Sequence, residues 1–220
     1  MTDPQLLDRF RQSRVIAVLT LDNPRWAVPL ARALVAGGID VMELTLRTPA
    51  AFEALRAIIA EVPEMLAGAG TVLNPRQVTE VRAAGAAFGV APGTNPRVIE
   101  AARKEGLFFA PGVATPSDIE AALELDCRVL KFFPAEPCGG LRYLKNMAAP
   151  YLHLGVQFIP LGGLSTGNLP DYLADPLILA VGGSWIAPRE RIAAQDWPAI
   201  TKSAQEASVI ASKFKAQRSA

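Results

Sequence analysis

The 220-residue sequence predicts an α/β fold, a single-domain (β/α)8 barrel that spans residues 1–220. Short apolar runs rich in β-branched residues recur eight times along the chain, and most of them lead into Gly, Pro or Thr. Segments whose apolar residues recur with helical spacing separate these runs. The main alternative is an open doubly wound sheet, which usually has fewer strands and carries a G-x-G-x-x-G motif after its first strand. That motif does not follow the first run here.

The eight apolar runs are expected to be the barrel strands. Their near-continuous apolar character is typical of parallel strands that are buried on both faces. The predicted strands cover residues 15–19, 40–46, 65–69, 87–90, 107–110, 128–133, 157–160 and 177–181. In such a barrel the active site lies at the carboxyl ends of the strands, in the loops that follow them.

The intervening Ala/Leu/Arg/Glu-rich segments are expected to be the outer helices. Five of them cover residues 25–36, 50–61, 75–84, 96–105 and 116–125. Pro stands near the start of four of these segments, where its missing N–H costs nothing. Gly37, Gly85 and Gly106 follow helix ends, where Gly is a favoured cap. A further helix is expected before the first strand, and an amphipathic helix over residues 200–215 is expected to cover the barrel from outside.

Composition excludes several classes of function. The chain has 22 Lys and Arg against 21 Asp and Glu, so its net charge of +1 does not favour nucleic acid or an anionic membrane as partner. One His and two Cys cannot build a zinc site of these residues, and a Ser-His-Asp triad would depend on His153 alone. The polar N-terminus and the short apolar runs predict neither a signal peptide nor a membrane span, and we expect a soluble, cytoplasmic protein.

The second predicted strand places a carboxylate in apolar surroundings. Alternation puts Glu43, Thr45 and Arg47 on one face of the segment 40–48. A buried Glu is costly unless it is paired or functional. Glu43 and Arg47 could therefore form a structural ion pair, or Glu43 could act in catalysis. The third strand ends at Thr71, whose Gly-rich approach could admit a ligand or simply lead into the next helix.

The sixth predicted strand contains a lysine among bulky apolar residues. Burial disfavours the ammonium form of Lys131, and a neutral lysine amine attacks ketones to form a Schiff base. Alternatively, the Lys131 charge could be paired with Glu43 or Glu136. A glutamate and a lysine that face one cavity from two strands favour catalysis.

Gly-Gly pairs follow the last two predicted strands. They are Gly162-Gly163 and Gly182-Gly183, and Ser184 comes directly after the second pair. The loops after strands seven and eight of a barrel often form a phosphate site with the N-terminus of a short helix. Glycines let backbone N–H groups approach phosphate oxygens. These loops are therefore the predicted phosphate site.

Four motifs occur in order along the chain: Glu-Leu-Thr-Leu-Arg-Thr (43–48), Gly-Ala-Gly-Thr-Val-Leu-Asn-Pro (68–75), Lys-Phe-Phe-Pro-Ala-Glu (131–136) and Gly-Gly-Ser-Trp (182–185). They resemble the motifs of 2-keto-3-deoxy-6-phosphogluconate (KDPG) and 4-hydroxy-2-oxoglutarate (KHG) aldolases, over residues 15 to about 203. The resemblance implies a (β/α)8 barrel, a homotrimer and a class I aldolase, an aldehyde-lyase with no metal or other cofactor. It also implies the last step of the Entner–Doudoroff route, in which KDPG is split into pyruvate and glyceraldehyde 3-phosphate.

The resemblance further implies roles for individual residues. Lys131 resembles the Schiff-base lysine, and Glu43 resembles the general acid/base. Arg47 and Thr71 resemble the groups that hold the pyruvyl carboxylate, and Phe133 resembles the aromatic wall beside the imine. Five residues match the phosphate end of the family site: Gly162, Gly163, Gly182, Gly183 and Ser184.

Leu161 departs from the family pattern, which often has Thr before the first Gly-Gly pair. The change removes a hydroxyl near the substrate, so it bears on discrimination between epimers and between phosphorylated and unphosphorylated keto acids. Three alternatives stay open at this point. They are an aldolase that prefers KHG or another 2-keto-3-deoxy acid, a phosphate-binding barrel isomerase that forms no imine, and a non-catalytic barrel that binds a phosphorylated metabolite.

Overall fold

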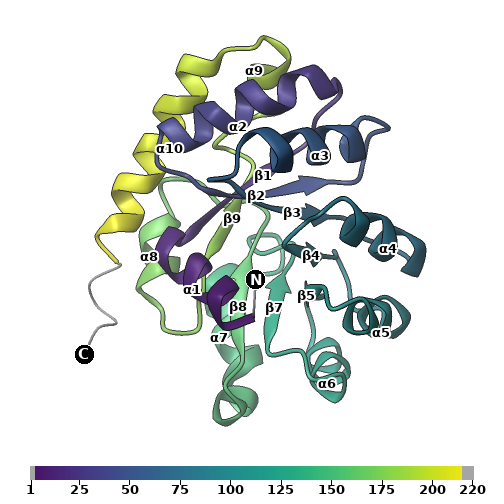
Figure 1. The fold of residues 1–220 in the computed structure, drawn as a ribbon. Helices are drawn as coiled ribbons and strands as arrows, with labels where there is room; N and C mark the ends of the chain where they lie inside the picture. Colours follow the sequence, from purple (N-terminus) through teal and green to yellow (C-terminus); the bar gives the residue numbers. More distant parts are fainter. Residues whose placement is uncertain (1–2, 215–220) are drawn as a thin grey trace.

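The computed structural model describes residues 3–214 and shows a ring of parallel strands surrounded by helices (Figure 1). The strands are β1 (Val15–Leu19), β2 (Val41–Thr45), β3 (Leu66–Gly70), β4 (Phe88–Val90), β5 (Phe108–Ala110), β6 (Gly112–Val113), β7 (Val129–Phe132), β8 (Gln157–Pro160) and β9 (Val181–Gly183). Nearly all strand residues are buried, as the continuous apolar runs predicted.

Two hydrogen-bonded sheets together close the ring. Their strand orders are β5-β4-β3-β2-β1-β9 and β6-β7-β8, and every pair is parallel. β5 and β6 follow one another around Pro111, so they form one barrel strand. Isolated bridges, Phe158 with Ile178 and Leu161 with Gly182, link β8 to the segment that contains β9. The predicted (β/α)8 barrel is confirmed.

The eighth predicted strand is wrong in its extent. The apolar run 177–181 was expected to be the strand, but β9 starts at Val181 and continues through the glycines. The buried guanidinium of Arg14 explains the difference, because its nitrogens donate to the carbonyl oxygens of Ile178 and Leu179 at 2.8 and 2.9 Å. These two carbonyls therefore serve a side chain instead of a neighbouring strand.

The helices lie outside the strands in the expected order (Figure 1). The α-helices are α1 (Asp3–Ser13), α2 (Ala27–Ala36), α3 (Ala51–Glu61), α4 (Pro75–Ala83), α5 (Pro96–Lys104), α6 (Pro116–Glu124), α7 (Gly140–Ala148), α8 (Leu169–Ala174), α9 (Arg189–Ala193) and α10 (Trp197–Ser212). Two 3-10 turns, η1 (Pro24–Trp26) and η2 (Ala149–Leu154), complete the set. The predicted segment 25–36 is thus divided between η1 and α2.

Side-chain caps explain where three of the predicted helices begin. Asn74, Asn95 and Thr115 each accept a hydrogen bond from a backbone N–H in the first turn, and Pro follows each of them. The helix predicted over 200–215 begins earlier, because Asp196 caps α10, and its predicted last residue lies outside the described residues.

The N-terminal helix covers the amino end of the barrel. Phe10 of α1 is fully buried and packs edge-to-face on Phe88, with ring centroids 5.1 Å apart. Phe88 and its neighbour Phe108 are the first residues of β4 and β5, so α1 closes the end where the strands begin. The carboxyl ends of the strands are left for a site. Within residues 3–214, no helix is long and apolar enough to cross a membrane.

Candidate active site

A cavity of about 380 Å³ opens at the carboxyl ends of the strands. Its walls come from several sides of the barrel, since they include residues of β1, β2, β7 and β9 and of the loops that follow β3, β4 and β8. The lining residues are Val18, Glu43, Thr45, Arg47, Thr71, Pro92, Lys131, Phe133, Leu161, Gly162, Gly182 and Ser184.

Lys131 and Glu43 meet at the base of this cavity. The Lys131 Nζ atom of β7 donates a hydrogen bond to Glu43 Oε1 of β2 at 2.9 Å. The two side chains are only 6% and 3% exposed. Within the barrel, a charged pair so deeply buried is costly to desolvate and adds little net stability over an apolar pair. A reactive amine with a proton acceptor in direct contact is the arrangement that nucleophilic catalysis needs.

Gly70, at the end of β3, makes room for the Glu43 carboxylate. A Cβ atom at position 70 would lie 1.9 Å from Glu43 Oε1, far closer than any non-bonded contact of a Cβ atom allows. Sequence reasoning treated this glycine only as a general approach to Thr71. In the parallel register of β2 and β3 Glu43 is opposite Gly68, so its side chain reaches two residues along β3, toward the carboxyl end, to lie over Gly70.

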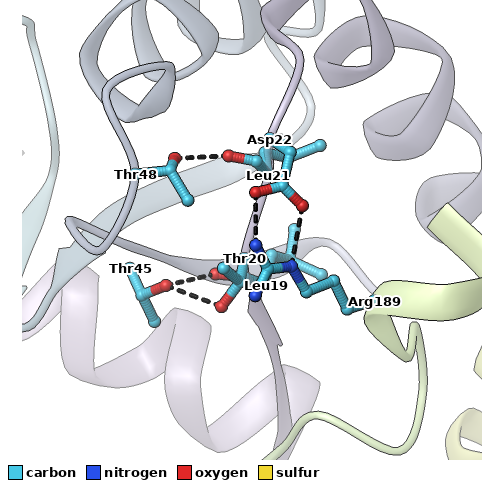
Figure 2. Close-up of polar contacts among 7 residues, drawn as sticks. All are labelled: Leu19, Thr20, Leu21, Asp22, Thr45, Thr48 and Arg189. Atoms are coloured by element: carbon cyan, nitrogen blue, oxygen red, sulfur yellow. Dashed lines mark hydrogen bonds and ion pairs between the residues drawn. The ribbon is translucent and has the colours of Figure 1, made fainter. Parts of the chain in front are cut away.

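Arg47 and Thr71 lie on the same side of the cavity, after β2 and β3. Thr71 has a φ of 60°, a left-handed conformation that is uncommon outside Gly. In the sequence, Arg47 lies between two threonines that are hydrogen-bonded to β1 and to the loop after it. Thr45 Oγ1 donates to the Leu19 carbonyl at 2.9 Å, and Thr48 Oγ1 donates to the Leu21 carbonyl (Figure 2). These ties hold the backbone on both sides of Arg47. Of the alternatives left open, the pair of Glu43 with Arg47 is not formed, and the pair of Lys131 with Glu43 is.

Phe133 forms an apolar wall next to the lysine. The Lys131 Nζ atom lies 5.5 Å from the centroid of the Phe133 ring. Leu161, which follows β8, lines the same cavity and is buried. Its side chain fills the space over Gly182, where a Cβ atom would lie 2.4 Å from Leu161 Cγ.

The two Gly-Gly pairs are partly at the cavity and partly needed for packing. Gly162 and Gly163 have φ angles of 101° and 82°, which favour glycine. Gly162 lines the main cavity, and Gly163 lines a neighbouring cavity of about 520 Å³. Gly182 and Ser184 also line the main cavity, whereas Gly183 lies against the Trp185 ring, which a Cβ atom would approach to 1.6 Å.

Sequence reasoning missed several lining residues. Val18 and Pro92 carry no chemical signal of their own, and only the closed ring shows that they face the lysine. Thr45 was placed on the correct face of its strand, but its hydrogen bonds to β1 could not be foreseen without the strand pairing. Within residues 3–214, no group of three or more His, Cys, Asp or Glu is placed to hold a metal ion.

Comparison with known proteins decides the family. The model of the KDPG and KHG aldolase family matches residues 6–203 of the chain. The chain belongs to this family. The resemblance that the four motifs carried is thereby confirmed.

Individual aldolases align along almost the entire chain. The 2-dehydro-3-deoxy-phosphogluconate aldolase of Treponema pallidum is 46% identical over 201 residues, 91% of this chain and 95% of that protein. The crystal structure of KDPG aldolase from Legionella pneumophila, with pyruvate captured as a covalent carbinolamine, has a TM-score of 0.86 and 41% identity, over 90% of this chain and 96% of that one. The KDPG aldolase of Zymomonas mobilis ZM4, with 3-phosphoglycerate, has a TM-score of 0.86 and 42% identity, over 93% and 95% of the two chains.

In this aldolase, eight of the ten predicted site residues line one cavity: Glu43, Arg47, Thr71, Lys131, Phe133, Gly162, Gly182 and Ser184. Gly163 lines the neighbouring cavity, and Gly183 supports Trp185. Their positions are observed, and their individual roles stay predictions.

Proposed function

We propose that this chain is a class I aldolase that cleaves KDPG into pyruvate and glyceraldehyde 3-phosphate. The observation that carries the proposal is the contact of 2.9 Å between the buried Lys131 amine and the Glu43 carboxylate at the base of an open cavity. The membership of the family and the pyruvate adduct of the Legionella pneumophila aldolase support it.

The first step forms a covalent bond between the enzyme and the keto acid. Lys131 passes one proton to Glu43, and the neutral amine attacks the C2 carbonyl carbon of the substrate. The carbonyl oxygen takes one proton from the attacking nitrogen and one from Glu43 and leaves as water, which yields an iminium ion on Lys131. Arg47 can grip the substrate carboxylate with two parallel hydrogen bonds, so the ketone is held against the amine.

The second step breaks the carbon–carbon bond. Glu43, directly or through one water molecule, removes the proton of the C4 hydroxyl. The C3–C4 bond then breaks, and its electron pair moves into the iminium to form an enamine while the aldehyde departs. Protonation of the enamine at C3 and attack of water on the iminium release pyruvate and restore the Lys131 amine.

Reduction with borohydride in the presence of pyruvate tests this proposal. The wild-type protein is expected to gain one reduced pyruvyl group per chain, at Lys131, as measured by intact mass and peptide mapping. Lys131→Met keeps the length of the side chain without its amine, and it is expected to gain none and to lose aldol cleavage. Equal labelling of the two proteins would show that the imine forms at another amine, and the absence of labelling in the wild type would favour an isomerase or a binding protein.

The second candidate is an aldolase of the same class that acts mainly on unphosphorylated KHG. The observation that favours it is the apolar Leu161 side chain in the cavity wall. The values of kcat/KM for KDPG, for its unphosphorylated analogue and for KHG separate the two candidates. A homotrimer and a cytoplasmic location, expected from the resemblance and from the composition, also stay predictions.

A further inference from the structure

A second cavity, of about 520 Å³, adjoins the catalytic cavity on its outer side. The two cavities share Val18, Arg47 and Ser184, so a ligand that is bound at Lys131 can extend past these residues. The outer cavity is also lined by Gly163 and by Arg189, the first residue of α9. The ten residues that the sequence singled out for the site do not include Arg189.

Asp22 fixes the Arg189 guanidinium along one edge. Arg189 Nε donates to Asp22 Oδ2 at 2.7 Å, and Nη2 donates to Oδ1 at 2.5 Å (Figure 2). A guanidinium has five N–H donors in a planar fork, and this bidentate contact uses two of them. The N–H groups of Nη1 lie on the edge that faces away from Asp22. The side chain is 60% exposed, so the guanidinium is accessible to a solute in the cavity.

The loop that carries Asp22 is itself anchored. The Leu21 carbonyl, directly before Asp22, accepts a hydrogen bond from Thr48, and the Thr20 hydroxyl lies 2.9 Å from Thr45 Oγ1 (Figure 2). Asn23, directly after Asp22, caps η1 through its side chain. Asp22 is therefore presented by a tied loop. An exposed ion pair by itself contributes little to stability, but this one fixes the direction of a guanidinium at the edge of a cavity.

We infer that Arg189, oriented by Asp22, binds the terminal phosphate of the substrate in the outer cavity. The assignment rests on the proposed function, because it requires that the C2 carbonyl carbon of the substrate lies at Lys131. The guanidinium then lies between two anions, with the Asp22 carboxylate on one edge and the phosphate on the other. A planar, permanently charged fork is well suited to phosphate. Asp22 acts here as a positioning residue.

The charges around the outer cavity bear on this assignment. Arg47 adds a second cation to its wall, and Glu190 adds a carboxylate. Glu190 therefore opposes a bound phosphate, and its removal is expected to strengthen phosphate binding. The hydrogen bond from Arg189 holds the pKa of Asp22 below its usual range, so Asp22 stays ionised and the pair stays formed at neutral pH.

The test compares phosphorylated and unphosphorylated substrates in one variant. Arg189→Gln is expected to raise KM and lower kcat/KM for KDPG by about 10- to 100-fold, the usual effect of losing a charged hydrogen-bond donor. The same variant is expected to change kcat/KM for the unphosphorylated analogue by less than about twofold, and to trap pyruvate with borohydride as the wild type does. Inorganic phosphate should inhibit KDPG cleavage competitively in the wild type and much more weakly in Arg189→Gln.

Two further variants distinguish phosphate binding by Arg189 from a purely structural role of its ion pair with Asp22. Asp22→Asn leaves the Arg189 charge in place and is expected to raise KM for KDPG with little change in kcat. Glu190→Gln is expected to lower that KM. An Arg189→Gln variant whose activity falls equally on both substrates, or whose inhibition by phosphate is unchanged, would overturn the assignment. A wild type that cleaves KDPG and traps no pyruvate would instead overturn the imine mechanism.

Discussion

The Lys131–Glu43 pair combines structural cost with chemical use at a single contact. Each of the two side chains is buried enough that its charge depends on the other for compensation. A variant that removes only the carboxylate charge of Glu43 therefore shows whether Glu43 has a role in the reaction beyond neutralising Lys131.

Glu43→Gln is expected to retain imine formation and to lose turnover. The amide keeps the shape of the side chain and its hydrogen-bonding capacity, but it cannot accept the proton of the C4 hydroxyl. We expect kcat for KDPG cleavage to fall by roughly 10²- to 10⁴-fold, as for other acid–base groups. Borohydride trapping of pyruvate checks the first step, and steady-state kinetics checks the second. Unchanged turnover would reduce Glu43 to a structural partner of the lysine.

Gly70→Ala is expected to damage the site without direct removal of a functional group. The new Cβ atom would overlap Glu43 Oε1, so the carboxylate must leave its contact with Lys131. We expect kcat to fall at least tenfold, by analogy with other losses of acid–base positioning. Gly93→Ala is the matched control, since a Cβ atom there meets nothing within 4 Å. Equal activity of the two variants would show that the Glu43 carboxylate can act from another position.

A single functional residue could be predicted where its chemical character differs from that of its neighbours in the sequence. Lys131 and Glu43 could be found in the sequence because a charge in an apolar strand is a visible anomaly. Gly70, Val18 and Pro92 could not, because their importance arises only across strand pairs, and no pairing partner is written in the local sequence.

At the scale of elements, α1 covers the amino end of the barrel, which we call the barrel floor. Its Phe10 ring fills the space between the first residues of β4 and β5. The ring belongs to the same buried cluster as Val18 and Leu161, which line the catalytic cavity. The packing of α1 is therefore continuous with the residues that line the site.

Phe10→Ala is expected to lower the free energy of unfolding by about 3–5 kcal/mol, the usual cost of deleting a fully buried aromatic ring. Urea denaturation followed by circular dichroism measures the change. Val209→Ala in α10 removes an apolar side chain that is exposed, and it is expected to stay within about 0.5 kcal/mol of the wild type. A small effect of Phe10→Ala would show that α1 is not part of the cooperative core.

Elements were predictable where the local pattern and the tertiary contacts agree. Helices that begin at Asn-Pro or Thr-Pro start where the sequence indicated, because the cap is a local interaction. Arg14, more than 160 positions before the segment 177–181, binds the carbonyl groups of Ile178 and Leu179, so these two do not join a strand ladder. A long-range side-chain contact of this kind leaves no trace in the local apolar pattern.

At the scale of the whole molecule, the pair of Asp22 and Arg189 links the loop after β1 to the start of α9, the helix that follows β9. This link adds a stability term that depends on pH. The hydrogen bond from Arg189 lowers the pKa of Asp22, so the ionised form is favoured by folding. The contribution is fully present above the ordinary Asp pKa of about 4 and is lost as the pH falls through the lowered pKa.

Asp22→Asn is therefore expected to be less stable than the wild type at neutral pH, and the difference should shrink below about pH 4. Melting temperatures of the two proteins, measured from pH 7 to pH 3, check the trend. A difference that stays constant, or that grows as the pH falls, would contradict the sign of the Asp22 shift.

The closed ring was predictable as a whole because eight alternating units leave few other architectures. The sequence could not show that β5 and β6 are separated by Pro111, or that two isolated bridges complete the ring next to β9. These details depend on contacts between segments that are distant in the sequence and meet where β8 lies beside β9. The residues Gly162, Gly163, Gly182 and Ser184 lie at the two cavities, and their role in phosphate binding stays a prediction. The proposed contact of Arg189 with the phosphate comes from α9, which the sequence did not single out.

The covering of the barrel floor by α1 has a kinetic consequence. With the amino end sealed, substrate and both products use the mouth formed by the strand-to-helix loops. In the proposed mechanism, pyruvate is still joined to Lys131 when the carbon–carbon bond breaks, so the aldehyde departs first. The bond to Lys131 sets this order and the sealed end gives both products one exit, so product-inhibition patterns should show pyruvate as the last product to leave.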